Sequence, residues 1–140
     1  MRTARFVVRA VPGSVNRSSG RHWSEDHRER QTFLALGRIA ITQALSRGEW
    51  DGRPFERARV RLTFFWPWPA SRRDPTNYLG GSGVKGLLDA FRPQYRAEIG
   101  AFPLRDDSFG RIEVVPVDGG VDRRDPRTEI SIEELESAGV

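Results

Sequence analysis

The residues with the clearest chemical potential lie in three short motifs between Arg72 and Asp107. They are RRDPTN, then VKGLLDA on a predicted helix, then LRDDS just before a predicted strand. Asp74 precedes a proline turn and Asp106 and Asp107 come before the strand, so three carboxylates stand at ends of elements, where several can converge. Oxygen ligands suit hard cations such as Mg²⁺, which can activate water and neutralise charge at a phosphate. The motifs therefore predict a magnesium-dependent phosphodiester hydrolysis site, a nuclease centre.

Lys85 is the only lysine among 23 basic residues. A lysine is a compact, flexible point charge that can approach a single phosphate oxygen, whereas arginine is a planar fork. Chance retention of one surface lysine explains the residue equally well when it is taken alone. The formal net charge of +4 and a pI near 10.5 favour a polyanionic partner.

Composition excludes several other classes of site and bounds the domain count. A chain of 140 residues is predicted to be one domain, 1–140, that both binds and catalyses. Cysteine is absent and there are two histidines, which excludes disulfides, thiolate zinc sites and histidine-rich metal sites. No apolar run is long enough for a signal peptide or a membrane span, so we expect a soluble cytoplasmic protein.

Hydrophobic periodicity predicts an α+β fold. The first half reads as a strand over Arg5–Val11, a polar loop over Gly13–Trp23 and a helix from Ser24 that stops at Gly48. Small residues on the apolar face of that helix should let it pack closely on a sheet. These are Gly37, Ala40 and Ala44.

The second half adds an alternating strand, a short helix and two further strands. The predicted ranges are Ala58–Trp66, Val84–Phe91, Arg111–Val117 and Thr128–Ile132, with 133–140 as a tail that frays or forms a short helix. The order β, α, β, α, β, β indicates one compact domain with a mixed sheet of about four strands packed against two helices.

Two features could contact nucleic acid or could be purely structural. The loop with Asn16, Arg17 and Arg21 could grip a phosphate backbone, although such loops are also commonly just solvated. Trp66 and Trp68 could stack on bases, but a tryptophan at the end of a strand is more often a lid on the core.

Taken in order, the motifs resemble those of the RusA family of Holliday-junction resolvases, short homodimeric endonucleases often encoded by phages and prophages. The resemblance covers most of the chain. It matches a strand leading to a proline and an asparagine, an RRDxDN motif, a KxxxDAL helix and a late DD before a strand. The matching ranges are Val11–Asn16, Arg72–Asn77, Lys85–Phe91 and Asp106–Asp107.

The resemblance implies a role for each matching residue. The metal-binding aspartates would be Asp74 and Asp107, with Asp106 or Asp89 as further ligands, and the essential lysine would be Lys85. Asn77 would orient Asp74 or a water. Mg²⁺ is the implied cofactor, with Mn²⁺ able to substitute. DNA phosphates would be held by Arg72, Arg73, Asn16, Arg17 and Arg21.

The chain departs from the family pattern at two places. Thr76 stands where many relatives have a second aspartate, so one expected carboxylate is missing. Tyr78–Val84 is longer than the usual link, and its glycines suggest a flexible insertion more than a phosphate loop. Asp89 lies four residues after Lys85 and could replace the missing ligand or simply pair with the lysine.

The expected function is therefore resolution of four-way DNA junctions by paired symmetric nicks, in recombination and repair, by a homodimer. Three alternatives stay open. The chain could bind branched DNA with weak or no nuclease activity, or cut flaps and forks instead of junctions. It could also be an RNA-binding or interaction domain, which would leave the aspartate and lysine pattern unexplained.

Overall fold

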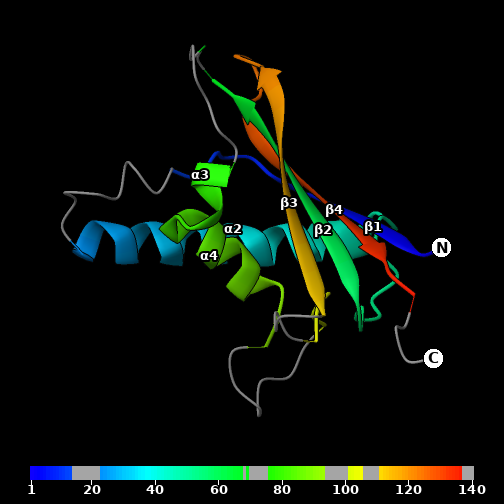
Figure 1. The fold of residues 1–140 in the computed structure, drawn as a ribbon. Coiled ribbons are helices and arrows are strands. Elements are labelled where there is room, and N and C mark those ends of the chain that lie inside the picture. Colours follow the sequence, from blue (N-terminus) through cyan, green and yellow to red (C-terminus); the bar gives the residue numbers. More distant parts are fainter. Residues whose placement is uncertain (14–22, 68, 70–75, 94–100, 106–110, 137–140) are drawn as a thin grey trace.

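A four-stranded sheet forms the centre of the structure, a computed structural model that describes residues 1–13, 23–67, 69, 76–93, 101–105 and 111–136 (Figure 1). The strands are β1 (Thr3–Val8), β2 (Ala58–Trp66), β3 (Ile112–Val121) and β4 (Arg127–Glu134). Their order in the sheet is β1-β4-β2-β3. β2 runs parallel to β3, and β4 runs antiparallel to both β1 and β2, so the predicted mixed sheet is confirmed.

Strict alternation in β2 determines which face of the sheet is buried. Every second residue from Ala58 to Trp66 is almost fully buried, and the residues between them are partly or fully exposed. Neighbouring strands contribute Phe6 and Ile130 to the same core. Trp66 is 1% exposed, so its indole belongs to the core and is not available to stack on a base, as the structural interpretation predicted. Trp68 lies outside the described residues.

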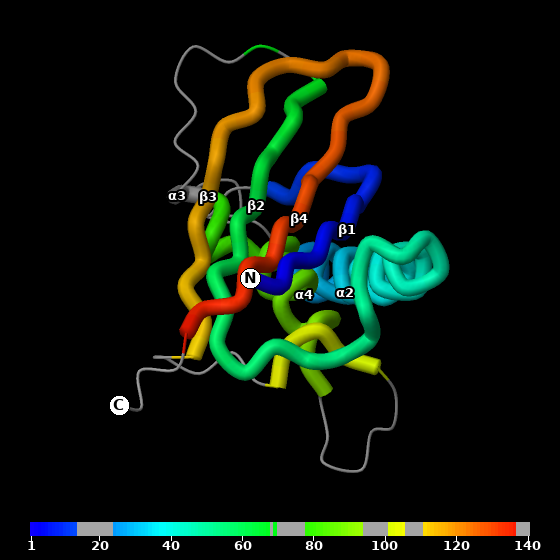
Figure 2. The backbone as a smooth tube through the Cα atoms, turned by 90° about the vertical axis from the view of Figure 1, so that its right-hand side faces the viewer, coloured from blue at the N-terminus to red at the C-terminus, as the bar shows by residue number. Residues whose placement is uncertain are grey.

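The helices lie on one side of this sheet (Figures 1 and 2). α2 (Trp23–Ser46) and α4 (Ser82–Ala90) are the two principal helices, as predicted, and the four-residue α3 (Thr76–Leu79) precedes α4. The apolar side of α4 is buried through Val84 and Leu87. Within the described residues, the α+β architecture of two main helices on a four-stranded mixed sheet is therefore confirmed.

Small residues bring α2 and α4 unusually close together. A Cβ at Gly37 of α2 would lie 2.6 Å from the Cβ of Ala90, and a Cβ at Gly86 of α4 would collide with the carbonyl oxygen of Arg30. Gly37 was predicted to allow packing on the sheet, and that detail is wrong because its neighbours are on α4. The contact matters for the site, because it fixes α4 directly against the backbone of α2.

Several predicted boundaries need correction. The link over Tyr78–Val84 is not a loose insertion, since α3 and the start of α4 occupy most of it. The strand predicted over Arg111–Val117 extends further, because β3 continues through Gly119 and Gly120 to Val121. Glu133 belongs to β4 and not to the tail, because it pairs with Thr3.

Replacing Gly86 with alanine should destabilise the fold although alanine is the better helix former. Alanine gains about 1 kcal/mol in helix propensity over glycine. The added methyl group must displace the backbone of Arg30, and overpacking typically costs about 1–3 kcal/mol. We expect a net loss of about 1 kcal/mol in the free energy of unfolding, measured by urea denaturation. Gln43→Ala, on the exposed side of α2, is the control, and a Gly86→Ala variant more stable than wild type would contradict the packing argument.

The face of the sheet away from the helices carries ion pairs. Glu129 on β4 accepts hydrogen bonds from Arg5 at 2.6 Å and from Arg127 at 2.8 Å. The guanidinium of Arg127 also lies over the ring of Phe65, 3.9 Å from its centroid. Partial burial alone would raise the pKa of Glu129, but the hydrogen bonds from both arginines outweigh it, so the pKa lies below the ordinary value of 4.5.

This lowered pKa gives Glu129→Gln a pH-dependent effect on stability. A carboxyl with a depressed folded-state pKa stabilises the protein above its unfolded-state pKa, and the contribution is lost as the pH falls through the folded-state value. Near neutral pH the variant should be less stable by about 1 kcal/mol. Below the ordinary value of 4.5 the difference should shrink as wild type takes up the proton. Melting temperatures of both proteins across this range test the sign, and a constant difference down to about pH 3 would contradict it.

Candidate functional site

Most of the predicted site residues lie outside the described part of the chain. They are Asp74, Asp106, Asp107, Arg72, Arg73, Asn16, Arg17 and Arg21. Asn77 lies in α3, but its side chain is also outside the description. Lys85 and Asp89, both on α4, are the two whose surroundings the structure describes. The described part of the candidate site therefore centres on α4.

Lys85 lies one turn into α4 and its side chain is exposed. It makes no ion pair with any described residue, whereas most of the described acidic groups are paired with arginine. The lysine borders a pocket of about 330 Å³ between the N-terminal half of α2 and the start of α4. The other residues that line the pocket are Asp26, His27, Arg30, Gly80 and Ser82.

Glu29 of α2 holds the N-terminus of α4 in place. The N-cap residue Gly81 has no side chain that could cap the helix. Instead, Glu29 Oε1 accepts hydrogen bonds from the backbone N–H of Gly83 and the hydroxyl of Ser82, both at 3.1 Å. The same oxygen accepts a longer one, at 3.4 Å, from the N–H of Gly13. The Glu29 carboxylate thus links Gly13, which follows β1, to α4. It also accepts from the Gly83 amide at the N-terminus of that helix.

Asp89 is clamped by two arginines. Its side chain is 7% exposed. Oδ2 accepts hydrogen bonds from Arg30, including one of 2.8 Å from Nε, and Oδ1 accepts one of 2.9 Å from Nη2 of Arg92. The prediction that Asp89 pairs with Lys85 is therefore wrong. A metal ion at Asp89 would compete with these two arginines for the same carboxylate, and the role of Asp89 as a ligand stays a prediction.

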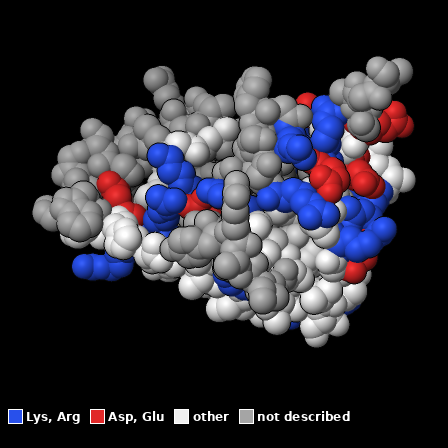
Figure 3. All heavy atoms as spheres, turned by 90° about the horizontal axis from the view of Figure 1, so that it is seen from below, with Lys and Arg blue, Asp and Glu red and all other residues white. Residues whose placement is uncertain are grey.

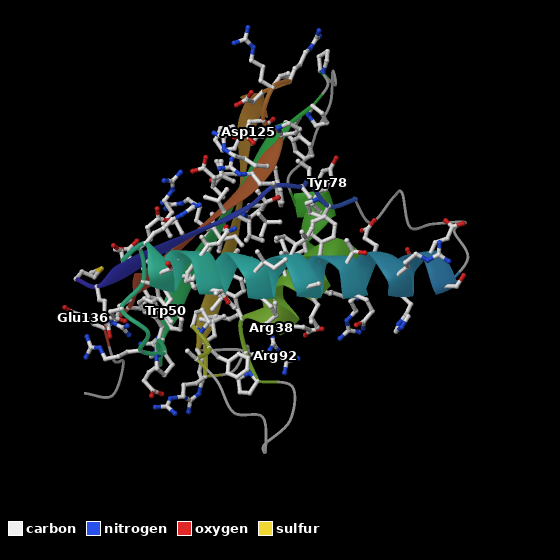
Figure 4. All side chains as sticks on the ribbon, turned by 180° about the vertical axis from the view of Figure 1, so that it is seen from behind. Arg38, Trp50, Tyr78, Arg92, Asp125 and Glu136 are labelled. Atoms are coloured by element: carbon white, nitrogen blue, oxygen red, sulfur yellow. The ribbon has the colours of Figure 1, made fainter. Side chains whose placement is uncertain are left out.

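Helix α4 crosses α2, so the residues before α4 and those after it lie on different sides of α2 (Figure 4). Figure 4 shows Tyr78, just before α4, above α2, and Arg38 and Arg92 below it. The Tyr78 ring packs 4.7 Å from the indole of Trp66, so α3 lies near the end of β2. Basic side chains form a band across the face of the molecule seen from below, with acidic groups against several of them (Figure 3).

The two segments that carry the predicted aspartates are anchored at opposite ends of β2. Thr76 begins α3, near Trp66, whereas Ile112 begins β3 opposite Ala58. Leu104 forms a bridge with Phe55, also at the starting end of β2. Eight strand residues at about 3.3 Å each separate these ends by roughly 26 Å. Asp74 and Asp107 themselves lie outside the described residues, so their convergence within one chain stays a prediction.

The sequence pattern did not indicate four residues of this site, which are Arg30, His27, Ser82 and Glu29. His27 and Arg30 are three residues apart on α2, which places them on one side of that helix. Nothing in the local pattern indicates that this side meets Lys85, because the meeting depends on the crossing of two helices distant in sequence. Arg30 reaches α4 through its hydrogen bonds to Asp89.

Comparisons with known proteins leave the family open. No protein-family model matches the chain. A search of curated proteins also finds no match. In the part of the chain that the structure describes, no three histidine or acidic side chains are grouped so as to hold a metal ion. No helix there is both long enough and apolar enough to cross a bilayer.

Asp89→Asn tests whether Asp89 is a structural clamp. The amide oxygen can accept from one arginine, but the NH₂ group faces the other arginine, and neither guanidinium keeps a charged partner. Arg30 is 46% exposed, so water offsets part of the loss, and we expect the free energy of unfolding to fall by about 1–3 kcal/mol. The fall should be the same with excess Mg²⁺ and with a chelator. A loss of stability seen only in Mg²⁺ would instead identify Asp89 as a metal ligand.

Proposed function

We propose that this chain is a Mg²⁺-dependent, structure-selective endodeoxyribonuclease that resolves four-way DNA junctions, as the resemblance to the RusA family implies. The observation that carries the proposal is Lys85, exposed and without an ion pair among the described residues, beside a pocket shared with Arg30 and His27. The last two residues of RRDPTN begin α3, and this lysine lies in the next helix, α4. A polyanion is the natural partner of such a pocket in a protein of net charge +4.

The carboxylates proposed to hold Mg²⁺ are Asp74 and Asp107, with Asp106 as a further ligand. Their oxygen atoms are the donor type that this cation prefers. Asp89 is occupied by arginines and the described residues contain no ligand cluster, so the described part of the chain adds no further ligand set. Bound there, Mg²⁺ would supply a Lewis acid that neutralises charge at the scissile phosphate and activates water.

The protein side chains have separate tasks in this proposal. Lys85 places a compact positive charge beside the phosphate as negative charge develops. Asn77 orients Asp74, and the basic residues of the RRDPTN motif and of the loop after Gly13 hold flanking phosphates. Those residues are Arg72, Arg73, Asn16, Arg17 and Arg21. A homodimer acting in the cytoplasm would present two equal sites for the paired cuts of recombination and repair.

A branched-DNA-binding protein without nuclease activity is the second candidate. Two observations favour it: Thr76 stands where the family pattern has an acid, and Asp89, the other candidate carboxylate on α4, is held by two arginines. Flaps or forks as substrates are a variant of the main proposal, since the same centre would cut them. A labelled four-way junction incubated with Mg²⁺ or Mn²⁺ separates a cutter from a binder, because a binder shifts the junction but releases no nicked product.

Asp107→Asn should lower the rate of junction cleavage by at least about 100-fold while leaving junction binding within about twofold of wild type, because a metal ligand is lost but the basic surface remains. Cleavage rate and gel-shift affinity are measured side by side. Glu113→Gln, an exposed acidic residue on β3, is the matched control and should cut normally. Cleavage at the wild-type rate by the Asp107→Asn protein would refute the assignment.

A further inference from the structure

We propose that the pocket between α2 and α4 is a seat for one phosphate group of the nucleic-acid strand, held by Lys85, Arg30 and His27. The inference deepens the proposed function and rests on it for the identity of the strand, but the binding of phosphate can be tested by itself. Its residues are distinct from all the arginines that the motifs assign to DNA contact.

The lining of the pocket has the chemistry of an anion site. His27 and Arg30 come from α2, and Lys85 and Ser82 come from α4. Basic side chains from two elements therefore border one space, and the Ser82 hydroxyl there donates to Glu29. A volume of about 330 Å³ is at the small end of the range for ligand sites, which suits a phosphate with part of its sugar better than a stacked base.

Arg30 can bind Asp89 and a phosphate in the pocket at the same time. Its Nε and Nη2 bind Asp89, which fixes the plane of the guanidinium. Nη1 makes no hydrogen bond within the described part of the chain, and the side chain is 46% exposed where it lines the pocket. A guanidinium held by a buried carboxylate loses little conformational entropy when it binds a phosphate oxygen.

Other occupants fit the pocket less well. Among the described residues that line the pocket, Asp26 is the one carboxylate, and a single carboxylate is too few for a metal site. The N-terminus of α4 is not the anion site, because Glu29 already accepts from Gly83 and Ser82 there. Binding must therefore come from the side chains, and Asp26 should weaken it by repulsion. Asp26→Asn is expected to tighten phosphate binding.

The first experiment needs neither DNA nor a divalent cation. Inorganic phosphate is titrated into the ¹⁵N-labelled full-length protein, with sodium chloride at matched ionic strength as the reference. The backbone amide signals of His27, Arg30, Ser82 and Lys85 should shift together and saturate. Shifts spread over the surface, or equal shifts with chloride, would overturn the proposal.

The second experiment compares Arg30→Gln with Arg92→Gln. Each variant removes one arginine from Asp89, but Arg92 does not line the pocket, so it controls for loss of the clamp. Arg30→Gln should weaken junction binding about three- to tenfold, and the plot of log affinity against log salt should be less steep by about one. Arg92→Gln should keep the wild-type slope. Equal losses and equal slopes in both variants would reduce Arg30 to a structural role and overturn the seat.

The outcomes separate this inference from the proposed function. If the protein binds phosphate at these amides but never cuts junctions, the phosphate site is supported and the nuclease proposal is refuted. If the protein cuts junctions but the Arg30→Gln and Arg92→Gln variants bind them alike, the nuclease proposal is supported and the phosphate site is refuted.

Discussion

The close crossing of α2 and α4 is the constraint on which the rest of the structure depends. Gly86 lies against the backbone of Arg30, so no larger residue fits there without moving one helix. That proximity lets Glu29 reach the start of α4 and Arg30 reach Asp89, one contact on each side of the crossing. The position of Lys85 follows from these contacts, because the lysine lies on the helix between them.

The elements that could be predicted from the sequence are those whose pattern is local. Ala58–Trp66 alternates at every residue, and the strand has these same bounds in the structure with its apolar side buried. Here the relevant information lies within a few neighbouring residues. Lys85 stands out by composition, as the only lysine of the chain, and its proposed role stays a prediction.

Contacts between distant segments could not be predicted in the same way. The glycines of Tyr78–Val84 suggested a loose insertion because a glycine taken alone indicates backbone freedom. Gly83, one of them, instead lies against Pro12 and the side chains of Glu29 and Phe33, a contact visible only in three dimensions. Asp89 was compared with Lys85 because they are four residues apart. Its partners are Arg92, three residues away, and Arg30, 59 residues away, whose guanidinium donates two hydrogen bonds to one carboxylate oxygen.

Abundant arginine also limits which carboxylates can act as metal ligands. An acid within reach of two guanidiniums, as Asp89 is, has both oxygens occupied and its charge neutralised. Asp122 is held in a similar way by Arg127, which lowers its pKa. A cation must compete with such partners for the same lone pairs, so acids clear of arginine are the better ligands. In this protein the arginines thus pair with most of the described acids, and the Mg²⁺ ligands that we propose are instead aspartates of the RRDPTN and LRDDS motifs.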